Sequence, residues 1–213
     1  MYVHGLWLSG RESLFLRRRL ASEFGLDVHP FHYPSVSLTM ADIAERLNAF
    51  MRELCAKRTN GCTVHLIGHS LGGLVIYRFL ERFPQQPSGR VVFLGTPCVE
   101  SRAAARAARL GWASKLIGRT VAEELLERRE RRWNAGRDLG IIAGTRRMGL
   151  GQLFAHFDED CDGTIAVSET KLPGATDHVT LPVSHMGMLL SARVARHTGH
   201  FLAHGRFALD ALR

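Results

Sequence analysis

The chain has 213 residues, of which 46% are hydrophobic and 23% are charged, and its formal net charge at pH 7 is +8. The length fits one domain with a sizeable core, and the composition excludes a disordered or fibrous chain. No apolar run reaches the roughly 18 residues that a membrane-spanning helix needs. The first residues also lack the basic and then apolar pattern of a signal peptide, so we expect none.

The first residues predict a strand followed by a helix. Tyr2–His4 is a short strand candidate, and a helix is expected over residues 11–24, with Ser9 as its cap and Gly25 as its end. Residues 26–33 are typical of an extended segment.

A second helix and the next strand follow. Thr39 and Asp42 form a capping pair, because they stand three residues apart before apolar residues at helical spacing. The run 63–67 predicts a buried strand, and glycines lead from it into a helix over 72–82 that Pro84 ends.

Three further strands are predicted, over residues 91–94, 139–143 and 177–182. Strands that alternate with helices of roughly ten or more residues favour an α/β fold. Its sheet would be mostly parallel and covered by helices on both faces. We therefore expect residues 1–213 to form a single domain.

One long stretch between the predicted strands lacks strand character. Residues 98–137 are predicted to be a helical cap or lid inserted into the domain, with helical patterns over 103–110 and 121–133. Between Arg102 and Arg147 there are 12 basic and 5 acidic residues. Such a patch could favour an anionic membrane surface, although a solvated pair of arginine-rich helices is the simpler explanation.

The four cysteines are scattered without C-x-x-C spacing, at Cys55, Cys62, Cys98 and Cys161. This pattern argues against a metal knuckle and against a dense disulfide framework. We therefore expect reduced cysteines and a cytoplasmic protein.

The strongest chemical signal is the sequence Gly68-His69-Ser70-Leu71-Gly72, which has the pattern G-x-S-x-G. It follows the predicted strand 63–67 and leads into the next predicted helix. A strand–turn–helix context is the one in which a serine hydroxyl is exposed on a strained turn, with glycines allowing the strand and helix to approach closely. The motif therefore predicts a nucleophile elbow.

In this context the chain resembles the α/β-hydrolase superfamily, and within it the compact bacterial lipases and esterases. His4-Gly5-Leu6 is similar to the family's oxyanion loop. The resemblance implies that Ser70 is the nucleophile and that the backbone N–H groups of Leu6 and Leu71 hold the oxyanion, where preorganised donors are needed. Gly95-Thr96-Pro97 is similar to the segment that lines the family's acyl pocket, with a simple turn as the alternative.

An acyl-transfer serine needs a histidine base, which itself needs a carboxylate. His185 stands in an S-H-x-G tract just past the last predicted strand, where the family places its catalytic histidine. His178 is the main competitor but lies inside that strand, and His200 and His204 fit a terminal helix. His69 is predicted to be a packing residue.

The tract from Asp162 to Ile165, D-G-T-I, is similar to the family's D-G-T-V tract, so Asp162 is the predicted acid. Asp158 and Asp160 are the alternatives. The same segment, with Gly163 and Glu169, also matches the calcium-loop pattern D-x-D-x-D-G-x5-E. A proline and a glycine soon after Glu169 prevent the helix that a calcium loop requires, so we expect no metal site.

These observations predict a serine hydrolase that cleaves a carboxylic ester through an acyl-serine intermediate. A thioesterase or amidase with the same triad is the alternative, and a non-catalytic calcium- or anion-binding protein is a more distant one. No cofactor is expected, and the partner would be a small-molecule or lipid ester. Nucleic acid is not expected, because aromatic and basic residues are not interleaved. The oligomeric state does not follow from the sequence.

Overall fold

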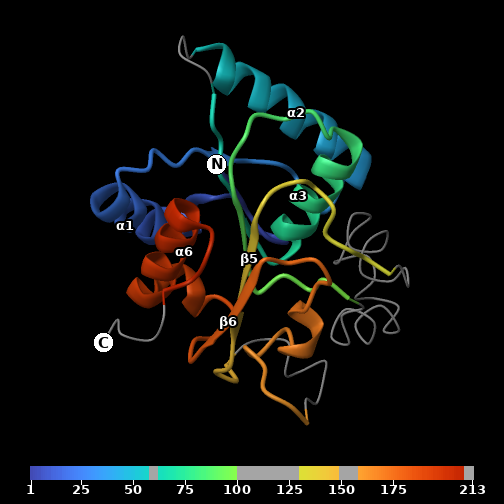
Figure 1. The fold of residues 1–213 in the computed structure, drawn as a ribbon. Coiled ribbons are helices and arrows are strands. Elements are labelled where there is room, and N and C mark those ends of the chain that lie inside the picture. Colours follow the sequence, from blue (N-terminus) through green and yellow to red (C-terminus); the bar gives the residue numbers. More distant parts are fainter. Residues whose placement is uncertain (58–61, 100–129, 149–157, 209–213) are drawn as a thin grey trace.

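The computed structural model describes residues 1–57, 62–99, 130–148 and 158–208. Within them, parallel strands form one sheet in the order β2-β1-β3-β4-β5-β6 (Figure 1). The strands are β1 (Tyr2–Val3), β2 (Pro30–Phe31), β3 (Leu66–His69), β4 (Val91–Leu94), β5 (Leu139–Gly144) and β6 (Asp177–Leu181). The structure therefore confirms the predicted α/β fold with a parallel sheet.

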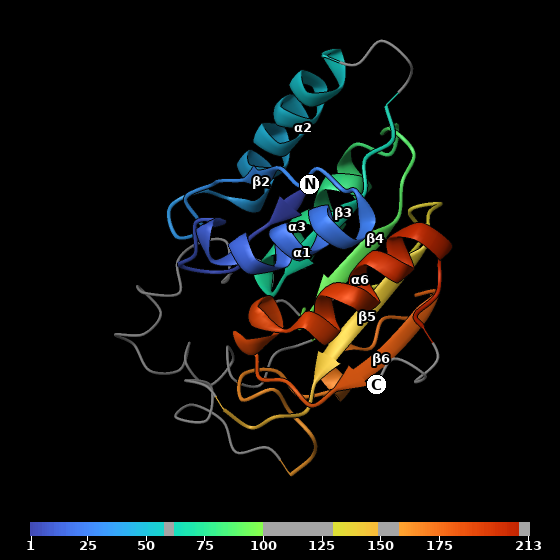
Figure 2. The same ribbon diagram turned by 90° about the vertical axis from the view of Figure 1, so that its left-hand side faces the viewer.

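Helices cover both faces of this sheet, which Figure 1 shows nearly edge-on. One face packs against α1 (Leu14–Phe24) and α6 (Ala192–His204), which lie in front of the sheet in Figure 2. The other face packs against α2 (Met40–Ala56) and α3 (Leu71–Arg82). Short 3-10 helices stand at residues Arg11–Ser13, Ser168–Thr170 and Gly187–Leu190.

The central strands are apolar on both faces because each face has its own helical cover. In β4, the side chains of Val91 and Phe93 belong to the core beneath α2 and α3, whereas Val92 and Leu94 belong to the core beneath α1 and α6. All four residues are fully buried. This is why the strand reads as a continuous hydrophobic run rather than an alternating one.

The start of α2 is fixed by a reciprocal pair of side chains, as the sequence predicts. Thr39 Oγ1 accepts a hydrogen bond from the backbone N–H of Asp42 at 3.1 Å. The carboxylate of Asp42 accepts one from the backbone N–H of Thr39 at 3.4 Å. The capping box therefore satisfies two donors that a helix start would otherwise leave unpaired.

Thr39→Ala is expected to lower the free energy of unfolding by about 1 kcal/mol, because it removes the acceptor for one of these donors. For a chain of this size the melting temperature should fall by roughly 2–4 °C. Thermal unfolding followed by circular dichroism measures the change. Ser22→Ala, at an exposed position in the last turn of α1, is the control, and an equal loss there would contradict the capping role.

Most predicted boundaries agree to within one residue, and three differences are larger. The third strand begins at Leu66 rather than at residue 63. Leu66 pairs with Val91, the first residue of β4, and the residues before Val91 form a loop in which Gly89 has φ 146°, so the residues before Leu66 have no strand to pair with. The cap of the first helix is not Ser9; Gly10 precedes the short 3-10 turn that leads into α1. Only Pro30–Phe31 of the extended segment pairs as a strand.

Most of the predicted lid lies outside the described residues. Its last part, residues 130–137, contains no helix. The predicted helix over 121–133 therefore does not reach Trp133. Arg131 is buried, and its guanidinium donates to the carbonyl oxygen of Cys98 at 3.2 Å. This arginine therefore joins residues 130–137 to the loop after β4 instead of adding to a solvated basic surface.

The expectation of reduced cysteines is wrong for two of the four. Cys55 and Cys62 form a disulfide that closes the connection between α2 and β3. Cys98 and Cys161 are free and buried. In the described ranges, no helix combines the length and the apolar character needed to cross a membrane.

The strand order has one point at which the winding of the sheet reverses. β1 lies between β2 and β3, and the chain leaves β1 toward α1 on one face but leaves β3 toward α3 on the opposite face (Figure 2). In open parallel sheets the connections diverge at such a point and leave a crevice beyond the carboxyl ends of the strands. Here His4 follows β1 and Ser70 follows β3, so both stand at this crevice.

Candidate active site

Ser70 stands on a sharp turn between β3 and α3. Its φ is 55° and its ψ is −125°, a conformation that costs a non-glycine residue about 1–3 kcal/mol. The turn is held by its own backbone: Ser70 N–H donates to Leu94 O at 2.9 Å, and Ser70 O accepts from Gly73 N–H at 3.1 Å. Such local strain at a serine, fixed by neighbouring strands, is the geometry of a nucleophile elbow.

The glycines of the motif are required by the close approach of α3 to the sheet. A Cβ atom on Gly68 would lie 2.5 Å from Gly73 Cα, and one on Gly72 would overlap the carbonyl oxygen of Val3. A larger residue at either position would push α3 away from β1 and β3. The start of α3, and with it Ser70, would then move.

The loop after β1 is anchored through the buried side chain of His4. His4 Nδ1 donates to Gly5 O at 2.8 Å, and its Nε2 accepts the backbone N–H of Tyr33 at 3.2 Å. The Tyr33 hydroxyl donates to His4 O at 2.7 Å, and the two rings are stacked. Burial lowers the pKa of His4, so the ring stays neutral and keeps one donor and one acceptor.

This loop runs directly beside the elbow. A Cβ atom on Gly5 would lie 3.0 Å from Ser70 Cβ. Leu71 is the first residue of α3, so its N–H has no partner within the helix. In the described part of the chain, no hydrogen bond occupies the N–H of Leu6 or of Leu71. Both predicted oxyanion donors are therefore unoccupied.

Asp162 is buried in a tight turn that orients its carboxylate. Its Oδ1 accepts the backbone N–H groups of Thr164 at 2.9 Å and Ile165 at 2.7 Å. Its Oδ2 is 2.6 Å from His185 Nδ1. With one oxygen held by the turn, the other is presented to the imidazole.

His185 lies in the turn after β6, with its ring directed by Asp162. The contact at Nδ1 makes this nitrogen the donor and leaves Nε2 as the site that can accept a proton. The backbone N–H of His185 also donates to Asp162 O at 2.9 Å. The main chain and the side chain of His185 are thus both fixed by one aspartate.

The aspartate–histidine pair and the elbow share the same end of the sheet. Gly95 follows β4, and a Cβ atom there would lie 3.0 Å from both Asp162 Oδ2 and His185 Nδ1. No hydrogen bond joins Ser70 to His185 among the described residues. Catalytic hydrogen bonds are often long until substrate is bound.

Gly95→Ala is expected to lower kcat by about 10- to 100-fold, because the new methyl group would displace the Asp162–His185 pair. It also places alanine at φ 56°, which costs stability. Gly136→Ala is the matched control, since Gly136 has φ 65° and open space around its Cβ position. Kinetics and melting temperatures separate the effects: both variants should lose stability, and an equal loss of kcat in both would contradict the contact.

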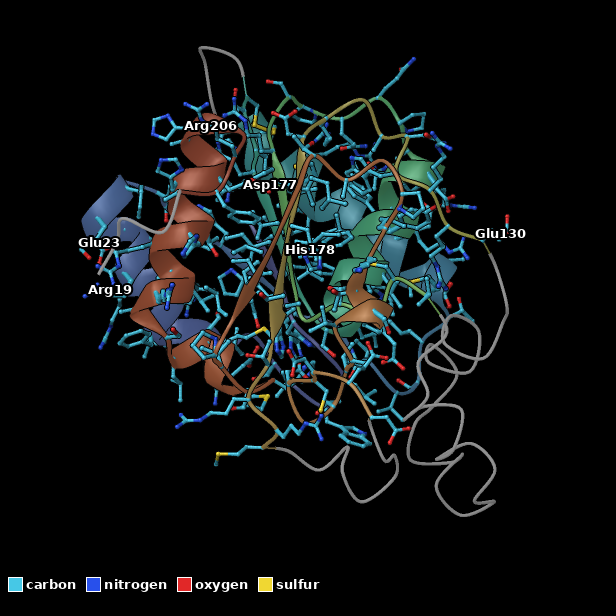
Figure 3. All side chains as sticks on the ribbon, turned by 60° about the horizontal axis from the view of Figure 1, so that its bottom comes forward. Arg19, Glu23, Glu130, Asp177, His178 and Arg206 are labelled. Carbon is cyan, nitrogen blue, oxygen red and sulfur yellow. A yellow bond between two sulfur atoms is a disulfide. The ribbon has the colours of Figure 1, made fainter. Side chains whose placement is uncertain are left out.

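The structure places the competing residues away from this pair. His178 lies within β6, on the α3 side of the sheet in Figure 3, and its Nε2 is 2.9 Å from Thr170 Oγ1. His200 and His204 are on α6, as predicted. Among the described residues, Asp162 bonds to none of these three histidines.

Asp162 Oδ1 and the carboxylate of Glu169 accept backbone hydrogen bonds from their own segment. Both oxygens of Asp162 are bound as described above, and Glu169 Oε2 accepts the N–H of Ala166 at 3.1 Å. Asp158 and Asp160 are exposed. Among the described residues, no group of three or more histidine, cysteine or acidic side chains is arranged to hold a metal ion.

Sequence reasoning missed three contacts of the site. Tyr33 holds the loop of His4, Gly95 leaves room for the Asp162–His185 pair, and His69 contacts His185. Gly95 had a signal, because a glycine directly after a buried strand often marks a close approach. The roles of Tyr33 and His69 depend on contacts between distant segments, which no local pattern reveals.

The fold and this end of the sheet define an α/β protein with a serine on a strained elbow beside a buried aspartate–histidine pair. The chain belongs to the alpha/beta hydrolase family, whose model matches residues 2–207.

Solved structures with the same fold include two lipases and a thioesterase. The mature lipase BlEst2 of Bacillus licheniformis aligns with a TM-score of 0.70 at 20% identity, over 96% of this chain and 90% of that one. The monoacylglycerol lipase of Paleococcus ferrophilus aligns with a TM-score of 0.63 at 16% identity, over 96% and 93%. The RedJ thioesterase of Streptomyces coelicolor aligns with a TM-score of 0.61 at 14% identity, over 93% and 83%. No curated protein sequence matches the chain.

Proposed function

We propose that this hydrolase cleaves carboxylic esters through an acyl-serine intermediate. The observation that carries the proposal is the 2.6 Å contact between His185 Nδ1 and Asp162 Oδ2 at the end of the sheet where Ser70 stands on its strained turn. The contact fixes the tautomer in which His185 Nε2 can take the proton of a serine hydroxyl.

In the first half of the reaction, Ser70 Oγ attacks the ester carbonyl carbon while His185 Nε2 accepts the hydroxyl proton. Asp162 stabilises the imidazolium that forms. The N–H groups of Leu6 and Leu71 bind the oxyanion of the tetrahedral intermediate, each donor contributing roughly 3 kcal/mol to lowering the barrier. His185 then protonates the leaving alcohol, and the acyl group stays on Ser70.

In the second half, water attacks the acyl-serine with His185 again acting as the base. The acid product leaves, and the proton returns to Ser70. The same steps would serve a thioester or an amide, because each presents a carbonyl carbon to Ser70 and a leaving atom that His185 can protonate.

Two measurements test the proposal. A fluorophosphonate probe reacts only with an activated serine, so it should label the wild-type protein once, at Ser70. A panel of p-nitrophenyl esters of increasing chain length, with a thioester and an anilide of matched acyl group, should then show hydrolysis of the esters. Absence of labelling together with absence of turnover on every substrate would contradict the proposal.

The domain organisation and the cellular location stay predictions. We propose that residues 1–213 act as one catalytic domain, in which Arg131 joins residues 130–137 to the loop after β4 through the carbonyl oxygen of Cys98. The predicted association with anionic membranes rests on the basic residues between Arg102 and Arg147. The Cys55–Cys62 disulfide is more typical of an oxidising compartment than of the predicted cytoplasmic location.

A further inference from the structure

His69 is the last residue of β3 and directly precedes Ser70. Its side chain is completely buried, and its Nε2 lies 3.1 Å from the backbone carbonyl oxygen of His185. A carbonyl oxygen can only accept, so His69 Nε2 must carry the hydrogen. The two imidazole rings are also in contact, with centroids 4.8 Å apart.

The other ring nitrogen shows that His69 is neutral. His69 Nδ1 is buried and has no hydrogen-bond partner, so a proton there would be an unsatisfied donor. Burial, and to a lesser extent the nearby His185, lower the pKa of His69 to about 3, against the opposing effects of its hydrogen bond to His185 O and of Asp162. The ring therefore donates one hydrogen bond at every pH at which a histidine base could work.

The hydrogen bond from His69 comes from a different element of the fold than the other two hydrogen bonds that hold His185. The contacts of its N–H and of its Nδ1 both come from Asp162. The contact of its carbonyl oxygen comes from β3, the strand that carries Ser70. His69 is thus a direct tie between the turn of the base and the strand of the nucleophile.

We infer that His69 is a positioning residue, whose Nε2–H fixes the backbone of His185 relative to Ser70 and so sets the alignment of the base. The inference rests on the proposed function of the triad. The sequence predicts only a packing role for His69, whereas here the position of His185 depends on the single hydrogen atom on His69 Nε2.

The packing explanation has its own support in the structure. The ring fills the space between the turn of His185 and the loop after β1, and a Cβ atom on Gly5 would lie 3.4 Å from His69 Nδ1. A side chain of similar bulk without a donor would satisfy packing but not positioning. The test must therefore change the place of the donor while keeping a polar side chain.

Glutamine and asparagine provide this comparison. The amide nitrogen of glutamine is separated from Cβ by as many bonds as Nε2 of histidine, whereas that of asparagine corresponds to Nδ1. His69→Gln is expected to keep kcat within about threefold of wild type. His69→Asn and His69→Leu are expected to lose about 10- to 100-fold in kcat with KM nearly unchanged, because the base is misaligned rather than the substrate weakly bound.

Two further readouts would not follow from a loss of stability alone. The acid limb of the pH profile of kcat/KM reports protonation of the base, and a looser contact with Asp162 should move it to lower pH in the asparagine and leucine variants. Proton NMR detects the low-field resonance of the hydrogen between His185 and Asp162, which should be weakened in these variants and retained with glutamine. His178→Leu, which removes a hydrogen-bonded histidine outside the site, is the control and should change neither readout.

Equal kinetics, pH profiles and NMR spectra for the glutamine and asparagine variants would overturn the inference, and so would an unchanged kcat in a folded His69→Leu. If the leucine variant fails to fold, the glutamine and asparagine pair decides. The resonance needs no substrate, so the inference is testable separately from the reaction. A wild type that neither labels nor hydrolyses esters would contradict the proposed function alone.

Discussion

Ser70→Ala is expected to lower kcat for ester hydrolysis by about 10⁶-fold and to abolish labelling by a fluorophosphonate, because the hydroxyl oxygen is the attacking atom. The residual rate would come from substrate binding and the oxyanion donors. His185→Ala should lose as much, since members of a triad act as one unit and their losses do not add. Initial rates on the best p-nitrophenyl ester measure both losses.

The fold should not change in the serine variant, and the backbone at position 70 gives a sharp check. Alanine keeps the strain of φ 55°, so Ser70→Ala should melt close to wild type. Glycine tolerates this conformation, so Ser70→Gly should be equally inactive but more stable by about 1 kcal/mol. An active Ser70→Ala, or a Ser70→Gly less stable than the alanine variant, would contradict the assignment of a strained nucleophile.

The elements of this fold are predictable from the sequence wherever a local signal is strong. Val91–Leu94 reads as a buried strand because both of its faces are covered, and Thr39 with Asp42 marks a helix start because the capping box is made of neighbours in sequence. The position of Ser70 is predictable for the same reason. Its strand, turn and helix follow one another within a few residues.

The parts that escaped prediction depend on partners far along the chain. The start of β3 depends on where β4 begins after the loop of Gly89. The pairing of Cys55 with Cys62 depends on the path of the chain between α2 and β3. The hydrogen bond from His69 to His185 spans 116 positions of sequence. A histidine beside the nucleophile looks like a packing residue until the turn of His185 is placed against it.

Asp162→Asn is expected to lower kcat by about 10⁴-fold while leaving the turn intact. Asparagine keeps an oxygen that can accept the N–H groups of Thr164 and Ile165, as Asp162 Oδ1 does. Its NH2 group would replace the oxygen that now faces His185 Nδ1. Because that group donates, it favours the tautomer with the proton on Nε2, where the proton of Ser70 would have to go.

Comparing Asp162→Asn with substitutions of its two acidic neighbours separates the triad from a calcium loop, because the two assignments need different sets of carboxylates. In the triad, Asp162 acts alone, so Asp158→Asn and Asp160→Asn, at exposed positions, should keep kcat within about twofold of wild type. In a calcium loop, all three carboxylates would bind the ion, and each loss would weaken it. EDTA should then leave the wild-type rate and melting temperature unchanged. A fall in either that calcium restores, together with losses in all three variants, would assign the acidic segment to a metal site.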